Sequence, residues 1–259
     1  DLAGMVQVAQ GQSVASRKER LGDTVGGLHE LIFYGAKGTA AYAQHAAVLG
    51  KEDDAVYQKF HELLAFVAEE STDLGAILPK ALEVGELNLR VMELLDDANT
   101  STYGHPEPTE VRVTPIAGKC ILVSGHDLLD LQLLLEQTAG KGINVYTHGE
   151  MLPTLAYPEL KKHSHLVGNY GGAWQDQKKE FDAFPGSILM TTNCIQRPAE
   201  TYKARIFTTG LVAWPGVTHI GDSKDFTPVI EAALAADGFA EDAAEEKKIT
   251  VGFGHNAVM

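Results

Sequence analysis

The spacing of hydrophobic residues changes along the chain and divides it into two parts. From about residue 23 to residue 98, apolar side chains recur every three or four positions, which is the period of an α-helix. This pattern predicts helices, among them 53–70 and 74–97, that pack as an antiparallel bundle. Their apolar stripes contain the following residues: Leu28, Leu31, Ile32, Tyr34, Tyr57, Phe60, Leu63, Leu64, Phe66, Leu78, Leu82, Val84, Leu87, Leu89 and Val91.

The helical pattern ends in residues 101–115, where Gly104, Pro106, Pro108 and Pro115 predict an extended linker. Short runs rich in β-branched residues follow, separated by helical or loop stretches. These runs predict strands at 120–124, 143–147, 165–169, 188–192, 205–208 and 249–253, and the intervening pattern predicts helices at 127–138 and 226–236.

Continuous apolar strands that alternate with helices are typical of a parallel sheet covered on both faces. The fold class that we expect is therefore α/β. A helical bundle portion with the linker, residues 1–115, precedes a Rossmann-like, doubly wound and mostly parallel sheet domain, residues 116–259.

Charge excludes two classes of partner. The 259 residues contain 21 Lys and Arg against 35 Asp and Glu, a net charge of −14, so neither nucleic acid nor an anionic membrane surface is expected as the main partner. No apolar run approaches the roughly 20 residues of a membrane-spanning helix.

Cysteine content and the first residues favour a cytoplasmic protein. Cys120 and Cys194 cannot form a disulfide framework, and Cys120, on a predicted strand, is expected to be a buried core thiol. Residues 1–20 lack the basic and apolar regions of a secretory signal. Because the chain does not start with Met, we also expect that it begins within a longer protein.

Three chemically distinct side chains follow predicted strands directly. His126 follows the run ILVSG, Glu150 follows VYTHG, and Cys194 follows LMTTN. In an open α/β sheet, ligands bind beyond the carboxyl ends of the strands, so these side chains are expected at one edge of the sheet.

Each of these residues also has an ordinary structural interpretation. His126 can be a polar residue at a helix N-terminus, Glu150 a surface carboxylate and Cys194 a small buried hydrophobe. Together they mix borderline, hard and soft ligands, which suits a redox-active iron centre with oxide and sulfide character better than a structural zinc site. The spacing contains no CxxC motif, and three protein ligands leave a metal cluster undercoordinated.

Other candidate sites are weaker. The sequence GNYGG at 168–172 lacks the order of a phosphate-binding loop and is interpreted as a tight turn, and Ser124 lacks the leading glycine of a hydrolase elbow. His163 and His165 are expected on the solvated surface, and Trp174 as a core or interface anchor.

Several longer motifs resemble those of the hybrid cluster proteins, also called prismane proteins or hydroxylamine reductases. They are YGHPEPT at 103–109, SGHDL at 124–128, YTHGEMLP at 146–153, HLVGNYGG at 165–172, TTNC at 191–194, WPGV at 214–217, ITVGFG at 249–254 and FYGAKG at 33–38. The resemblance covers nearly the whole chain from about residue 25.

This resemblance implies a four-iron hybrid cluster, bridged by sulfide and oxygen, that reduces small nitrogen compounds. It implies hydroxylamine reduction to ammonia, with nitric oxide reduction to nitrous oxide as an alternative, and an external electron-donor reductase as partner. The family's cluster ligands match His126, Glu150 and Cys194, the residues that follow the strands. Glu150 is also the residue expected to handle protons during N–O reduction.

The sequence departs from the family pattern at both ends. Members of the family begin with a cysteine-rich segment that holds a second iron–sulfur cluster, and they continue with further cluster ligands. Residues 1–20 contain no cysteine. The resemblance therefore implies a central portion that works with other fragments of the same protein.

Two other interpretations stay open. The chain can be a metal-free, truncated α/β scaffold or interaction module without catalysis. It can also be related to the nickel–iron carbon monoxide dehydrogenases, although the sequence YTHGE at 146–150 points away from them.

Overall fold

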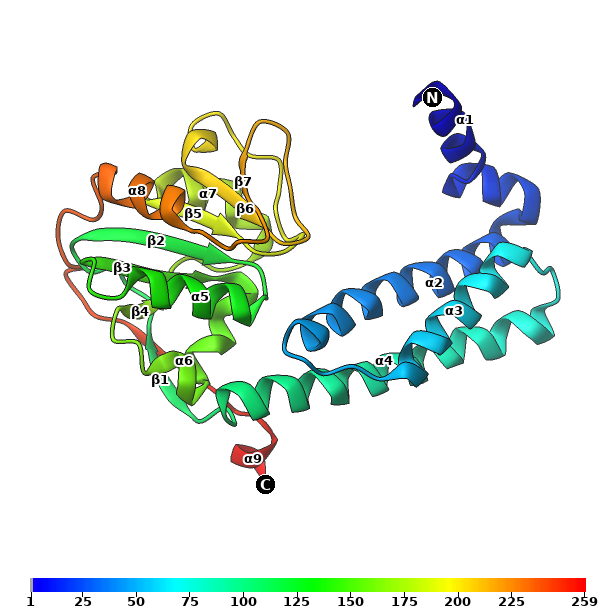
Figure 1. The fold of residues 1–259 in the computed structure, drawn as a ribbon, viewed down its shortest axis with the longest axis horizontal. Coiled ribbons are helices and arrows are strands. Elements are labelled where there is room, and N and C mark those ends of the chain that lie inside the picture. Colours follow the sequence, from blue (N-terminus) through cyan, green and yellow to red (C-terminus); the bar gives the residue numbers. More distant parts are fainter. Residues whose placement is uncertain (1) are drawn as a thin grey trace. The chain divides into compact units, whose positions relative to one another are not determined.

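The computed structural model describes residues 2–259, which form two compact units (Figure 1). One unit extends to Asn99 and the other is Thr100–Met259. The boundary between these units lies within a helix, whereas the predicted sequence domains divide after the proline-rich segment. Among the described residues, no helix combines the length and the apolar character needed to cross a membrane.

The first unit is helical, with α1 at Leu2–Gly11, α2 at Val14–Val48, α3 at Asp54–Glu69 and α4 at Leu74–Tyr103. Side-chain oxygens cap the helix starts, because the first amides of a helix lack partners within it. Ser13 accepts from the amide of Ser16, and Asp53 accepts from the amide of Ala55. The core of the bundle consists of Ile32, Ala43, Val56, Leu63, Val67, Ile77, Val84, Leu87 and Val91.

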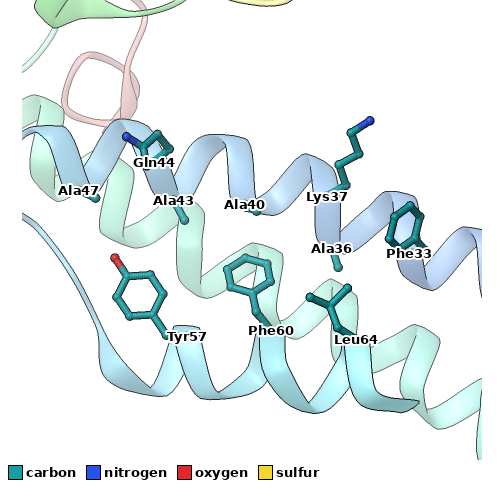
Figure 2. Close-up of a pocket in the computed structure, with 10 residues that line it drawn as sticks. All are labelled: Phe33, Ala36, Lys37, Ala40, Ala43, Gln44, Ala47, Tyr57, Phe60 and Leu64. Atoms are coloured by element: carbon teal, nitrogen blue, oxygen red, sulfur yellow. The ribbon is translucent and has the colours of Figure 1, made fainter. Parts of the chain in front are cut away.

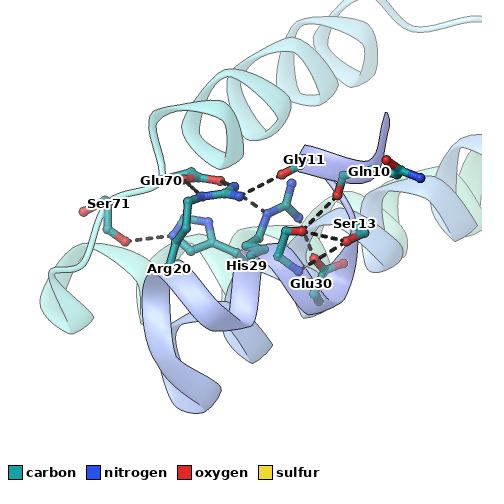
Figure 3. A network of polar contacts seen from close by, with 10 residues as sticks. Gln10, Gly11, Ser13, Arg20, His29, Glu30, Glu70 and Ser71 are labelled. Atoms are coloured by element: carbon teal, nitrogen blue, oxygen red, sulfur yellow. Dashed lines mark hydrogen bonds and ion pairs between the residues drawn. The ribbon is translucent and has the colours of Figure 1, made fainter. Parts of the chain in front are cut away.

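Ion pairs fix the start of α2 against the end of α3 (Figure 3). Arg20 and Arg17 pair with Glu70 at 2.5 and 3.6 Å. Arg17 also pairs within α2, with Glu30 at 2.7 Å. The buried ring of His29 donates from Nε2 to the carbonyl of Ser71 at 2.8 Å. These bonds hold the segment next to Gly22, where a positive φ of 78° kinks α2.

Part of the predicted apolar stripe on α4 is exposed, so that expectation was wrong. Leu82 is 73% exposed and Leu89 63% exposed, while Val84 and Val91 are buried. At about 100° per residue, the predicted stripe spans two sides of the helix. Only one of these sides faces α2 and α3.

The helices α2 and α3 leave an apolar groove of about 420 Å³ between them (Figure 2). On α2 the groove is lined by Ala36, Ala40, Ala43 and Ala47 among others, and on α3 by Tyr57, Phe60 and Leu64. The four alanines of α2 leave room opposite the large side chains of α3, and Phe33, Lys37 and Gln44 complete the α2 side.

The second unit is built on a six-stranded sheet with the order β4-β3-β2-β5-β6-β7. The strands are β2 at Lys119–Ser124, β3 at Ile143–His148, β4 at Leu166–Asn169, β5 at Ser187–Met190, β6 at Ile206–Thr209 and β7 at Thr218–Ile220. All neighbouring strands are parallel. The order reverses between β2 and β5, as in a Rossmann-like doubly wound fold, which confirms the predicted fold class.

Helices cover both faces of this sheet. The helix α7, Gln177–Ala183, contributes Phe181 to a cluster with Ile188 and Met190 of β5. On the opposite face, Ser187 donates its hydroxyl to the carbonyl of Val229 in α8, Thr227–Ala235, at 2.8 Å. The helix α5, Leu128–Thr138, connects β2 to β3.

The sequence-based strand assignments were wrong in two places. The run at 249–253 does not join the parallel sheet, because β8, Lys248–Val251, pairs antiparallel with β1, Thr109–Arg112, in a separate two-stranded sheet. The supposed linker thus contains a strand. The short strand β7 supplies the sixth place in the parallel sheet and was not predicted.

The expectation for His165 was also wrong, because its ring is half-buried. Its Nε2 lies 3.1 Å from the carbonyl oxygen of Leu135 and 3.0 Å from the hydroxyl of Thr138. Burial lowers the pKa of His165 below its ordinary value. The neutral ring of His165, which directly precedes β4, therefore links this strand to the end of α5 through these hydrogen bonds.

Candidate metal centre

His126, Glu150 and Cys194 come together at the carboxyl edge of the parallel sheet. Each offers a ligand atom, and these atoms all lie within 4.8 Å of one another. The Sγ of Cys194 lies 3.4 Å from Oε2 of Glu150, and Nε2 of His126 lies 3.9 Å from the same oxygen. The cluster is next to the point between β2 and β5 where the strand order reverses, which is where open α/β sheets bind ligands.

Glycines shape the turns that present these side chains. Gly125, between β2 and His126, has a φ of 117°. A Cβ at this position would lie 2.3 Å from Oγ1 of Thr191 and 2.9 Å from the backbone nitrogen of Thr192, so the turn after β2 packs directly on the turn after β5. Gly149, before Glu150, has a φ of 59° and opens the 3₁₀ helix η1, Gly149–Ala156.

The three side chains differ in exposure. The side chain of Glu150 is 63% exposed, that of His126 is 17% exposed, and Cys194 is half-buried. Burial raises the pKa of the Cys194 thiol, and the neighbouring Glu150 carboxylate raises it further. Without a metal, Cys194 is therefore a thiol that donates to Glu150.

A pocket of about 510 Å³ opens beside this cluster. Its lining includes Glu150 and Cys194 together with Ser124, His148, Trp174 and Gln177. Trp174 is 58% exposed, so it is not a core residue, and the alternative expectation of an interface anchor stays a prediction. Its Nε1 donates to the carbonyl of Cys194 at 2.9 Å.

A hydrogen-bonded chain that begins in the lining of the pocket was not found from the sequence. Ser124 Oγ lies 3.0 Å from Nδ1 of His148, whose Nε2 lies 2.8 Å from Oε2 of Glu180 on α7. The other oxygen of Glu180 accepts from the amide of Gly172 at 2.9 Å. The signal for His148 was available, because it immediately precedes Gly149 and Glu150. Glu180 is separated from them in sequence and carried no signal.

The three ligand atoms suit a metal centre. Ligand bonds of about 2.0–2.3 Å place the ligand atoms around one ion about 3.3–3.8 Å apart. The two separations from Oε2 of Glu150, 3.4 and 3.9 Å, are close to this range, and all three atoms lie within 4.8 Å of one another. A thiolate suits iron–sulfur bonding, and imidazole and carboxylate suit iron with oxygen ligands. A four-iron cluster requires more ligands than these three supply.

The sequence profile of the Prismane/CO dehydrogenase family matches residues 1–258. The chain belongs to this family. The resemblance to prismane proteins, identified from the motifs, is thereby confirmed.

Curated relatives in the family match along the whole chain and carry the name hydroxylamine reductase. The chain is 57% identical to the Burkholderia lata protein over 259 residues, which is all of this chain and 46% of the relative. It is 57% identical to the Acidithiobacillus ferrooxidans protein and 58% identical to the Solidesulfovibrio magneticus protein, with 46% and 48% of those relatives covered. The chain thus spans less than half the length of these relatives.

A solved structure with a similar fold belongs to an acetyl-CoA synthase/carbon monoxide dehydrogenase, and carbon monoxide dehydrogenase is the second protein in the name of the family. Alpha subunits of acetyl-CoA synthase/carbon monoxide dehydrogenase, described with NiZn[Fe4S4] and NiNi[Fe4S4] clusters, match with a TM-score of 0.57 at 15% identity. The match covers 83% of this chain and 38% of that chain. At this identity the likeness concerns the fold alone.

Proposed function

We propose that this chain is the part of a hydroxylamine reductase that contributes His126, Glu150 and Cys194 to a hybrid iron–sulfur–oxygen cluster. One observation carries the proposal: a nitrogen, an oxygen and a sulfur ligand converge within 4.8 Å at the carboxyl edge of the sheet. The relatives named hydroxylamine reductase support the choice of reaction.

The reaction is the two-electron reduction of hydroxylamine, NH₂OH + 2 H⁺ + 2 e⁻ → NH₃ + H₂O. When bound, the cluster supplies the electrons that break the N–O bond, and an external reductase replaces them. Cys194 holds the cluster through its thiolate, while His126 and Glu150 ligate through nitrogen and oxygen. The adjoining pocket, about 510 Å³, admits a small inorganic nitrogen compound.

Glu150 has a second role in this proposal. Its carboxyl group is the most exposed of the three ligands and borders the pocket, where it can hydrogen-bond the departing oxygen and pass it a proton. Glu150→Gln keeps the size of the side chain and removes this proton. In a protein that retains its cluster, the rate of ammonia formation is expected to fall about 100-fold or more. An unchanged rate contradicts the role.

The activity is tested in a chimera, because the relatives are more than twice as long as this chain. The 259 residues replace the matching 46% of the Burkholderia lata protein, and the product is purified without oxygen. Iron, sulfide and hydroxylamine-dependent ammonia formation are measured with a reduced viologen as electron donor. We expect iron and activity, and we expect Cys194→Ser to lose both.

The outcomes separate the alternatives. A folded chimera without iron supports a metal-free scaffold, and an iron-containing chimera that produces no ammonia refutes the reaction. Nitric oxide is assayed as a second substrate, with nitrous oxide as product, because the motif resemblance also implies that reaction. The unmodified Burkholderia lata protein is the positive control.

A further inference from the structure

The carbonyl of Cys194 is held by a buried glutamine at the start of α7. Gln177 is only 1% exposed, although its side chain is polar. Its Nε2 donates to the Cys194 carbonyl at 3.0 Å, and its Oε1 accepts from the amide of Gln196 at 2.7 Å. One side chain thus binds the main chain on both sides of Ile195. Such a buried amide is costly unless it is satisfied, and here both of its polar atoms are bonded.

We propose that Gln177 is the positioning residue for the metal-binding thiol of Cys194. The inference rests on the proposed function, since it assumes that Cys194 ligates a metal. Cys194 lies in a turn beyond the end of β5, outside any helix or strand. In the part of the chain that the structure describes, the hydrogen bonds of its Sγ are to Thr192 and Glu150, both at 3.4 Å. The geometry of the thiol therefore depends on what fixes its main chain.

Two donors share the Cys194 carbonyl, which leaves it little freedom to rotate. Gln177 is buried, and Trp174 Nε1, at 2.9 Å, belongs to an exposed indole. The carbonyl of Trp174 in turn accepts from the side chain of Gln196. A thiol held in this way is pre-organised for a metal. The conformational entropy of the turn is lost when the chain folds, so it is not lost again when a metal binds. Partners of metal ligands commonly change metal affinity by 10–100-fold when removed.

The chain contains a matched control for this arrangement. Gln137, at the end of α5, donates to the carbonyl of Lys224 at 2.7 Å and accepts from the amide of Phe226 at 2.9 Å. It bridges two residues spaced as Cys194 and Gln196 are, but it borders neither the pocket nor the ligand cluster. Gln137 is half-buried whereas Gln177 is buried. Loss of the two bonds of Gln137 thus shows what removing such a main-chain bridge costs without touching Cys194.

The test is an oxygen-free titration of the 259-residue chain with Co²⁺, followed by the thiolate-to-cobalt charge-transfer absorption. Gln177→Met and Gln137→Met are compared with the unchanged chain, and their melting temperatures are recorded. We expect both variants to melt at lower temperature. The Kd for Co²⁺ is expected to rise about 10-fold or more in Gln177→Met and to stay unchanged in Gln137→Met. If Gln177→Met does not fold, Gln177→Glu is compared with Gln137→Glu by the same criterion. Glu keeps the size of the side chain and replaces the amide donor to the carbonyl with an ionisable oxygen.

The outcomes distinguish this inference from the proposed function. If the unchanged chain gives no thiolate–cobalt absorption, the metal centre is refuted and the inference fails with it. If the unchanged chain binds Co²⁺ and the Gln177 variant binds it equally tightly, only the positioning role is refuted. Equal weakening in Gln177→Met and Gln137→Met also refutes it, since the effect is then a general loss of stability.

Discussion

At the scale of single residues, the two cysteines have the same chemistry and different surroundings. Cys120 is fully buried on β2, where burial raises the pKa of its thiol to about 12. Cys194 is half-buried beside Glu150 and borders the pocket. Among the described residues, Cys194 has neighbours that can bind a metal together with it, and Cys120 does not. Reactivity is thus set by position rather than by residue type.

Separate substitutions of the two cysteines test this difference in surroundings. Cys194→Ser is expected to abolish the thiolate–cobalt absorption of the chain, because the soft ligand is lost. Cys120→Ala is expected to leave the absorption unchanged and to lower the melting temperature, since it opens a small cavity in the core. The measurement is Co²⁺ titration with a thermal melt of each variant. Persistence of the absorption in Cys194→Ser would assign the thiolate to Cys120.

His165 makes stability depend on pH. Burial holds the pKa of His165 below its ordinary value. The folded chain therefore binds a proton at this ring only at a lower pH than the unfolded chain, which binds it as the pH falls through about 6.5. The contribution of the neutral ring is therefore complete above this pH and is lost as the pH falls below it, down to the folded-state pKa. We expect the free energy of unfolding to fall less between pH 7 and 5 in His165→Gln than in the unchanged chain. Denaturant unfolding measures this, and His163→Gln, at the neighbouring ring, serves as control.

At the scale of elements, the centre depends on how closely the turns after β2 and β5 approach each other. Gly125 has a backbone that favours glycine, and it has no room for a side chain against Thr191 and Thr192. Because His126 follows one of these turns and Cys194 the other, their packing sets the spacing of two ligands. The edge of the sheet is thus as constrained as its core.

Gly125→Ala is expected to destabilise the chain by about 2–4 kcal/mol, because strain at positive φ adds to the steric overlap with the facing turn. Gly140→Ala is the matched control, since Gly140 also has a positive φ of 71° and no heavy atom within 4 Å of the added Cβ. It is expected to cost only about 1–2 kcal/mol. Denaturant unfolding gives both values. Equal losses would show that the approach of the turns is not tight.

At the scale of the whole molecule, all three candidate ligands belong to the unit Thr100–Met259. This unit has its own core, which includes Leu122, Tyr146 and Phe184. The helical unit has a separate core. The three candidate ligands therefore all come from the α/β unit.

A fragment of residues 100–259 is expected to fold cooperatively and to bind Co²⁺ with the Kd of the full chain, within about a factor of two, since all three candidate ligands lie in this unit. It begins early enough to retain Tyr103, which is 1% exposed and packs edge-on against Tyr157. Circular dichroism and the charge-transfer titration are the measurements. A folded fragment with much weaker binding would show that the helical unit contributes to the centre.

The local pattern of hydrophobic residues was sufficient to predict the central strands of the α/β unit. The runs that became β2, β3 and β5 were recognisable because a strand buried on both faces is continuously apolar. The residues after them were recognisable because parallel strands end at one edge. The motifs led to the family because each of them is contiguous in sequence. His126, Glu150 and Cys194 were therefore available from the sequence as candidates.

Only the tertiary structure decided which distant segments meet. The strand β8 pairs with β1, which lies more than a hundred residues earlier in the chain. The apolar pattern of β8 does not indicate which strand it pairs with. Gln177 and Glu180 are ordinary polar residues in a short helix, and their importance comes from the carbonyl of Cys194 and the ring of His148. A periodic pattern records whether a side chain is buried, whereas a hydrogen bond depends on where two separate surfaces come together. The sequence by itself thus determined the buried parallel strands, the residues that follow them and the family. Tertiary packing decided the remaining strand pairs and the hydrogen bonds that support the candidate ligands.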